Sequence, residues 1–284
     1  MSRREVSSSL TEQVERLTAE SKARATAVSV HDLESGLRFS LRGDRWFHAA
    51  STIKVAVLLA LFRAVDEGRV RLDDSLHVRN RFFSAANGSP FQLNRDSDAM
   101  PELYQTIGQT AKVSALAEGM ISASSNLATN LLLDFVGVAY ARNVLRDAQV
   151  EGVELRRGVE DHAAHEKGIN NEATADGLMT LLSALRGNFL SSESKEQAIR
   201  ILLEQRFNSM IPAGVPPHAA VAHKTGEIST ACHDMGIVYL PEREPYIAVI
   251  LTEFDSEKEG RRETVAAISE AIYHSVMRMQ GEIK

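Results

Sequence analysis

The chain lacks several features that each identify a class of protein. Its single cysteine, Cys232, excludes an intramolecular disulfide. The net charge of −6 and the lack of a basic run argue against a nucleic-acid or anionic-membrane partner. The most apolar stretch, Val55 to Phe62, is far shorter than the roughly 20 residues that span a membrane. Nine scattered histidines complete no familiar zinc spacing. We therefore expect neither a metal nor another cofactor, and no membrane span.

The N-terminus also lacks the apolar core of a secretory signal, because residues 1–9 are polar. This leaves open either a cytoplasmic protein or a targeting segment that the chain does not contain. The hydrophobic fraction of 44% and charged fraction of 25% are typical of a soluble globular protein. A length of 284 residues suits two lobes better than one compact core.

The order of apolar patterns predicts an α+β fold. Helical spacing is found at 10–25, 51–67, 113–120, 127–135, 174–185, 194–203 and 261–279, and strand patterns at 26–30, 37–41, 219–223, 235–240 and 246–252. Residues 1–45 and 213–284 are predicted to form one α/β lobe, a five-stranded antiparallel sheet flanked by the N- and C-terminal helices. Residues 46–212 are predicted to form an all-helical lobe. Residues 78–110, called the excursion below, show no period, and we expect a long ordered loop.

Three short motifs carry the candidate chemistry. Ser51 and Lys54 stand three residues apart at the start of an apolar helix, so both fall on one face and the amine can activate the hydroxyl. Ser124-Ser125-Asn126 follows at a helix start, and Lys224-Thr225-Gly226 ends a strand. Taken singly, each motif also fits helix caps, a solvated lysine or a bulge. Their order and their settings together indicate a site.

The set resembles the S-x-x-K, S-D-N and K-T-G signature of class A β-lactamases and penicillin-binding proteins, although Ser125 stands where the signature has Asp. The flanks Phe47–Ala50 and Gly236–Pro241 are similar to those of the family, and the resemblance covers about residues 10–280. It implies a β-lactamase/transpeptidase-like fold and a serine acyl-transfer hydrolase that acts on a small β-lactam or acyl-peptide substrate. It also implies a periplasmic or secreted protein, and we expect a monomer.

The resemblance also implies roles for the motif residues. Ser51 would attack the substrate carbonyl, with Lys54 as the base or a link to it, and Ser124 would pass a proton to the leaving nitrogen. Asn126 would orient Lys54 and bind the substrate amide.

The third motif would recognise the substrate and stabilise the transition state. Lys224 and Thr225 would bind the carboxylate of the substrate, with Gly226 beside them. The N–H groups of Ser51 and Glu227 would hold the oxyanion.

The resemblance is incomplete where the acyl group would be released. Glu166 and Asn170 fit the family pattern E-x-x-L-N with Ile for Leu, so Glu166 is expected to activate the water and Asn170 to help hold it. No Arg directly precedes Glu166, and the loop spacing differs, so Glu160 and Asp161 are alternatives for this base. Release is therefore expected to be the slower step.

Substrate recognition also departs from the family. No Arg lies between Lys224 and Pro241, where many members place a helper cation. His233 on that stretch is at most a weak substitute, and a solvated turn histidine is the favoured interpretation of it. Three functions remain open. They are a β-lactamase, a penicillin-binding D-Ala-D-Ala peptidase or esterase that releases β-lactams slowly, and a non-catalytic peptidoglycan- or protein-binding module.

Overall fold

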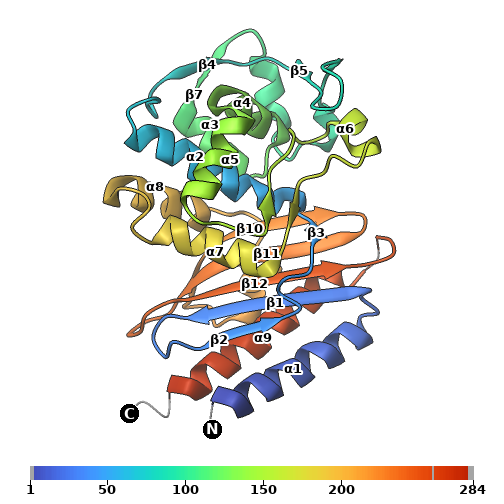
Figure 1. The fold of residues 1–284 in the computed structure, drawn as a ribbon, viewed down its shortest axis with the longest axis vertical. Helices are drawn as coiled ribbons and strands as arrows, with labels where there is room; N and C mark the ends of the chain where they lie inside the picture. The colour runs from blue at the N-terminus through green and yellow to red at the C-terminus, as the bar shows by residue number, and fades with distance from the viewer. Residues whose placement is uncertain (1–2, 258, 281–284) are drawn as a thin grey trace.

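The computed structural model describes residues 3–257 and 259–280 and confirms the α+β fold with a five-stranded antiparallel sheet (Figure 1). The strand order is β10-β11-β12-β1-β2. The strands are β1 (Ala25–Asp32), β2 (Arg38–Leu41), β10 (Ala220–Ile228), β11 (Ala231–Tyr239) and β12 (Tyr246–Glu253). Pairing of β1 with β12, from Ala25↔Glu253 to Asp32↔Tyr246, joins the N-terminal hairpin to the C-terminal meander.

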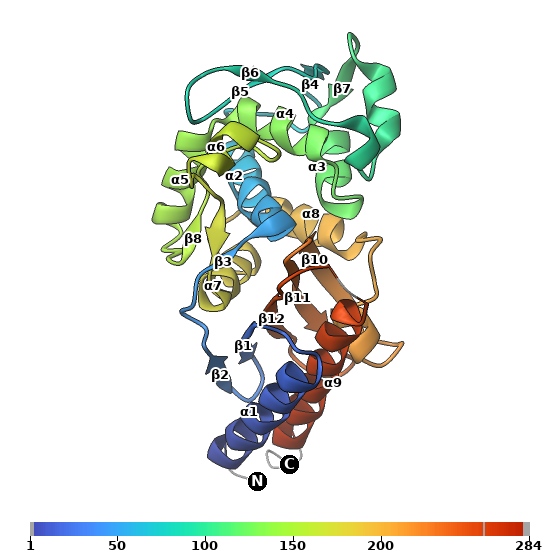
Figure 2. The same cartoon turned by 90° about the vertical axis from the view of Figure 1, so that its right-hand side faces the viewer.

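Two long helices cover one face of this sheet. α1 (Arg3–Glu20) and α9 (Arg261–Gln280) lie side by side (Figure 2). Leu10 and Val14 of α1 and Ile268 of α9 are buried against strand residues such as Val28. The apolar stripes predicted from sequence therefore form the core on this side.

The other face of the sheet carries the helical region. α7 (Ala175–Arg186) and α8 (Ser192–Leu203) lie next to the strands, and α2 (Lys54–Asp66) runs through the middle of the helices, as Figure 2 shows. Residues 55–62 are completely buried, which explains why α2 is apolar on all sides. α3 (Val113–Ser122), α4 (Asn126–Val136) and α5 (Val138–Asp147) surround it.

Residues 46–212 are not all helical, contrary to the sequence expectation. The region holds three small sheets, β3-β9-β8, β4-β7 and β5-β6. Their strands are β3 (Phe47–His48), β4 (Ser75–His77), β5 (Phe82–Phe83), β6 (Pro90–Phe91), β7 (Thr110–Lys112), β8 (Val153–Glu154) and β9 (Glu172–Ala173). Strands of two or three residues are too short to show a period of two, so sequence patterns could not reveal them. The placement of the lobe boundaries remains a prediction.

Short helical turns complete the chain. They are η1 (Ala50–Ile53), η2 (Arg95–Ser97), η3 (Pro101–Thr106), α6 (His162–Glu166) and η4 (Ile211–Gly214). The excursion is ordered, as expected, because β4 pairs with β7 and the Val78 N–H donates to Gln109 O at 2.9 Å. Among the described residues, no helix combines the length and the hydropathy of a membrane span. The monomeric state and the cellular location remain predictions.

Candidate active site

The first motif enters the site through a strained turn. β3 leads into η1, where Ala50 has a left-handed φ of +47° and donates its N–H to His48 Nδ1 at 3.0 Å. Ser51 follows and is partly exposed in a cleft, whereas Lys54, the first residue of α2, is completely buried. A left-handed non-glycine residue costs about 1–3 kcal/mol and is typical of segments that aim a functional side chain.

The second motif surrounds the Lys54 amine. Lys54 Nζ donates to Ser124 O at 2.7 Å, to Ser124 Oγ at 3.1 Å and to Asn126 Oδ1 at 2.8 Å. Ser124 also has a left-handed φ, +59°, and Ser125 caps α4 by accepting the Ala128 N–H at 3.2 Å. The turn between α3 and α4 thus directs the side chains of both Ser124 and Asn126 toward the Lys54 amine of the first motif.

The third motif approaches from β10. Lys224 Nζ donates to Ser124 Oγ at 3.0 Å and to Thr225 O at 2.9 Å. A Cβ on Gly226 would lie 3.0 Å from Thr52 Cγ2 and 3.1 Å from Thr52 N, so glycine lets this strand approach η1 closely. Ser124 Oγ therefore lies between the two lysine amines and links all three motifs.

Burial lowers the pKa of both lysines. The pKa of Lys54 lies well below its usual value, first because the amine is buried and second because Lys224 is close, while the carboxylates of Asp98 and Glu160 oppose the shift. Burial lowers the pKa of Lys224 to about 7, against the opposing charge of Asp234. The lowered pKa makes the Lys54 amine a better proton acceptor than an exposed lysine, and Lys224 titrates near neutrality.

Among the three acidic candidates, Glu160 is the one whose carboxylate contacts a motif residue, Asn126. Its Oε1 accepts the Asn126 side-chain amide at 2.6 Å and the Ser97 hydroxyl at 3.4 Å, and its Oε2 accepts the Asn94 N–H at 3.2 Å. Glu160 also has a left-handed φ, +57°, and lines the cleft together with Ser51. Asn126 therefore bridges Lys54 and Glu160.

The other acidic candidates lie elsewhere. Glu166 is exposed at the last residue of α6, and within the described part of the chain it forms no hydrogen bond with the motif residues. Asp161 is buried and caps α6 while accepting the Ser84 hydroxyl at 2.7 Å, so it anchors the loop. Asn170 Oδ1 contacts Arg157 Nη2 at 3.2 Å and His165 Nδ1 at 2.9 Å, and does not line the cleft.

Sequence reasoning missed two arginines and misplaced one histidine. Arg261 and Arg262, at the start of α9, line the cleft with Thr225, and both bind the Glu227 carboxylate, at 3.0 and 2.8 Å. Their position 35 or more residues after Thr225 gave no local signal. His233 is no helper cation, because it is fully buried in β11 and burial lowers its pKa to about 4.

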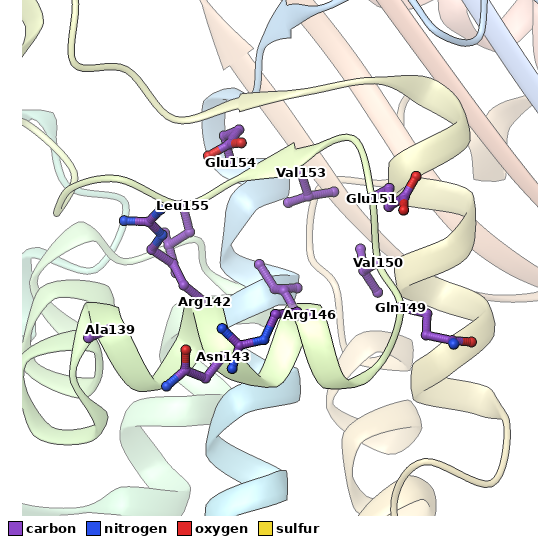
Figure 3. Close-up of a pocket in the computed structure, with 11 residues that line it drawn as sticks. Ala139, Arg142, Asn143, Arg146, Gln149, Val150, Glu151, Val153, Glu154 and Leu155 are labelled. Carbon is purple, nitrogen blue, oxygen red and sulfur yellow. The ribbon is translucent and has the colours of Figure 1, made fainter.

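The cleft has two adjoining hollows that share Ser51, Asn126 and Glu227. The hollow beside Glu160 measures about 430 Å³ and the one beside Arg261 about 470 Å³. A groove of about 580 Å³ lies elsewhere, between α5 and residues 149–155, and Figure 3 shows that none of the motif residues is among those around it. In the described residues, no group of three His, Cys, Asp or Glu side chains could hold a metal ion.

Comparisons with known proteins agree with this geometry. The family model described as "Beta-lactamase enzyme family" matches residues 9–276. β-Lactamase ROB-1 of Haemophilus influenzae is 26% identical over 256 residues, which cover 88% of this chain and 79% of that protein. A structure of an ancestral (GNCA) class A β-lactamase superposes with a TM-score of 0.80 at 26% identity, over 94% of this chain and 99% of that one. A variant of PBP-A, solved as its acyl-enzyme complex with penicillin G, superposes with a TM-score of 0.80 at 27% identity, over 95% of this chain and 96% of that one.

Proposed function

Because the chain belongs to the β-lactamase enzyme family and is a serine hydrolase of the class A β-lactamase type, we propose that it hydrolyses the amide bond of β-lactams through an acyl-enzyme on Ser51. The observation that carries this proposal is the convergence on Ser124, whose hydroxyl contacts Lys54 Nζ at 3.1 Å and Lys224 Nζ at 3.0 Å. Two buried amines around one hydroxyl form a proton path from the nucleophile to a leaving group.

In the acylation step, neutral Lys54 accepts the proton of Ser51 as Oγ attacks the lactam carbonyl carbon. The carbonyl becomes an oxyanion, held by the N–H groups of Ser51 and Glu227, and losing one such donor typically costs at least about a hundredfold in rate. The oxyanion collapses, the carbon–nitrogen bond breaks, and a proton reaches the nitrogen through Ser124. Before substrate binds, Lys54 Nζ donates to Ser124 and Asn126, and Lys54 itself follows Ser51 by about one helical turn of the chain.

Recognition of the substrate is assigned to the charged and polar groups of the hollow beside Arg261. Protonated Lys224 and the Thr225 hydroxyl suit the carboxylate that β-lactams carry. Arg262 is half-exposed beside the same hollow and supplies the positive charge that sequence reasoning did not find. Asn126 is positioned to bind the amide of the substrate side chain. Glu227 limits this charge, because it neutralises part of the arginine pair.

For release of the acyl group we propose Glu160 as the base, in place of Glu166. Glu160 lines the same hollow as Ser51 and is held by Asn126 at 2.6 Å, whereas Glu166 is exposed on α6. A water would lose a proton to Glu160 while its oxygen attacks the acyl carbon. The bond from that carbon to Ser51 Oγ then breaks, and Oγ regains a proton. Asn170 has no place in this step, because its side chain is bound to Arg157 and His165.

A second candidate is a penicillin-binding peptidase that acylates readily and releases slowly. The similarity to PBP-A, at 27% identity over 95% of the chain, favours it, since a variant of that protein was captured as a penicillin acyl-enzyme. The non-catalytic alternative is not favoured, because a binding module needs neither a nucleophile nor two buried amines.

A time course with a chromogenic cephalosporin separates these functions. A β-lactamase gives many turnovers per molecule, a slow-releasing peptidase gives about one equivalent of product followed by a much slower phase, and a binding module gives none. We expect repeated turnover. Absence of any product over hours, at an enzyme concentration comparable with that of the substrate, would contradict the proposal.

A further inference from the structure

The second motif lacks its acidic residue, because Ser125 stands where the signature has Asp. We infer that Asp98, in the excursion, supplies the missing carboxylate and acts as a positioning residue for Ser124 and Asn126. The inference rests on the proposed acyl-transfer function and deepens it, since it assigns the excursion a part in building the site.

The Asp98 carboxylate is buried and saturated with donors. Only 6% of the residue is exposed. Its Oδ2 accepts the N–H groups of Asn126 at 3.0 Å and Leu127 at 2.9 Å, which open α4, and Oδ1 accepts the Met100 N–H at 2.9 Å. The hydroxyls of Ser125, at 3.3 Å, and Tyr104, at 3.2 Å, also point to Oδ2. A carboxylate at a helix start is favoured by the unpaired N–H groups there.

These contacts hold the part of the chain whose geometry acylation needs. Ser124 is left-handed, a conformation that persists only where the surroundings over-determine it. The residues on either side are fixed in place, since Ala123 is buried at the end of α3 and Ser125 and Asn126 are bound to Asp98. If the start of α4 relaxes, the Asn126 side chain loses its place between Lys54, at 2.8 Å, and Glu160, at 2.6 Å.

The excursion reaches the opposite wall of the cleft as well. Asn94 and Ser97, within five residues of Asp98, bind the two oxygens of Glu160. Ser84 binds Asp161, which anchors the loop that carries Glu160. One segment thus connects the second motif to the proposed release base. Asp98 is its charged link to the start of α4, whereas Arg79 pairs with Asp134 farther along that helix.

The test measures acylation by a penicillin in single turnover, followed by intact-protein mass spectrometry. Asp98→Ala is expected to slow acylation by about 10- to 100-fold, the range for catalytic groups displaced by an ångström. Asp96→Ala is the matched control, because Asp96 lies two residues away, is exposed, and its carboxylate contacts no motif residue among those described. It should acylate within about twofold of the wild-type rate, like other surface substitutions.

Rescue distinguishes positioning from general destabilisation. Ser125→Asp restores a carboxylate within the motif itself. In the double variant with Asp98→Ala, the acylation rate should recover at least half of the loss, measured on a logarithmic scale. Ser125→Asp alone shows whether the new side chain fits. If that single variant is active and the double variant is as slow as Asp98→Ala, the inference is overturned. It is also overturned if Asp98→Ala, folded by circular dichroism, acylates at the wild-type rate.

Asp98→Asn keeps the assignment testable if Asp98→Ala does not fold. Three charges face the Lys54 amine, those of Lys224, Asp98 and Glu160, and the negative charge of Asp98 raises the pKa of Lys54. Removing that charge lowers the pKa, so the acidic limb of the acylation rate should move to lower pH. An unmoved limb together with an unchanged rate would contradict the assignment. No adduct on the wild-type protein would instead overturn the proposed function, and this inference with it.

Discussion

The two sides of the cleft are built differently. The side proposed for acylation, called the acylation side below, consists of Ser51 on η1, Lys54 on α2, Ser124 between α3 and α4 and Lys224 on β10, and both of its lysines are fully buried. The release side consists of Glu160 and the loops around it, residues 78–110 and 155–171, and Glu160 remains partly exposed. In the proposed mechanism, rigid elements therefore position the groups of the first reaction step, whereas contacts between loops position the base of the second.

This difference has a mechanical meaning. Displacing Lys54 requires a disturbance of the first part of α2, residues 54–62, which is completely buried, and this is costly. Displacing Glu160 requires only that the hydrogen bonds from Asn94, Ser97 and Asn126 break, and the first two come from exposed loop residues. We therefore expect substitutions on the acylation side to slow or abolish the first step, and substitutions on the release side to change the lifetime of the acyl-enzyme.

The largest effect is expected from Ser51→Ala. Loss of the nucleophile should remove the penicillin adduct and lower kcat by about 10⁶-fold, as for other serine hydrolases. Ser229→Ala removes a hydroxyl from the same cleft outside the motifs and serves as the control. Intact-protein mass spectrometry measures both. An adduct that survives in Ser51→Ala would place the nucleophile elsewhere.

A smaller effect is expected from Lys54→Ala, which leaves Ser51 without its base. Acylation should slow by at least about a hundredfold, the lower range for a positioned proton-transfer group. Lys167→Ala, at an exposed position on the release side, should leave the rate unchanged. Stopped-flow single turnovers on folded protein provide the measurement. Equal rates in the two variants would show that the acylation side does not depend on this amine.

Substrate binding should depend on pH through Lys224, whose pKa burial lowers to about 7. The amine is charged below that pH and attracts the carboxylate of the substrate, so KM should rise as pH increases through 7, by up to about tenfold per unit where Lys224 alone titrates. A methyl ester of the same penicillin has no carboxylate, and its KM should stay level. If the acid and the ester respond to pH identically, Lys224 is not the recognising charge.

The smallest effect concerns the wild-type time course. Because loop contacts hold the release base, we expect deacylation to be slower than acylation, by a few-fold or more. Such a reaction gives a burst of product that scales with enzyme concentration and then a slower steady phase. A linear time course from the first turnover would show that the release side works as fast as the acylation side, despite its different construction.

The features that the sequence could predict lie in the regular elements and the motifs of the acylation side, and those it could not predict lie in the loops of the release side. The five-stranded sheet, its two covering helices and the three motifs were predictable, because long periodic segments and short motifs are local signals. The contacts of Glu160 with Asn94 and Ser97, and of Asp98 with Asn126 and Leu127, join residues 28 to 66 positions apart across loops without a pattern. Glu166 matched a short pattern, but the fold of the loop leaves it exposed on α6 and brings Glu160 to Asn126.

The most direct test of this account compares Glu160→Gln with Glu166→Gln after mixing each with a penicillin. Glutamine keeps the shape of either side chain and removes its ability to accept a proton from water. We expect Glu160→Gln to acylate at close to the wild-type rate and to retain one equivalent of adduct on Ser51, with deacylation slowed by about a hundredfold or more. Glu166→Gln should turn over as the wild type does. The opposite result, a trapped adduct in Glu166→Gln and free turnover in Glu160→Gln, would contradict the assignment of the release step to Glu160.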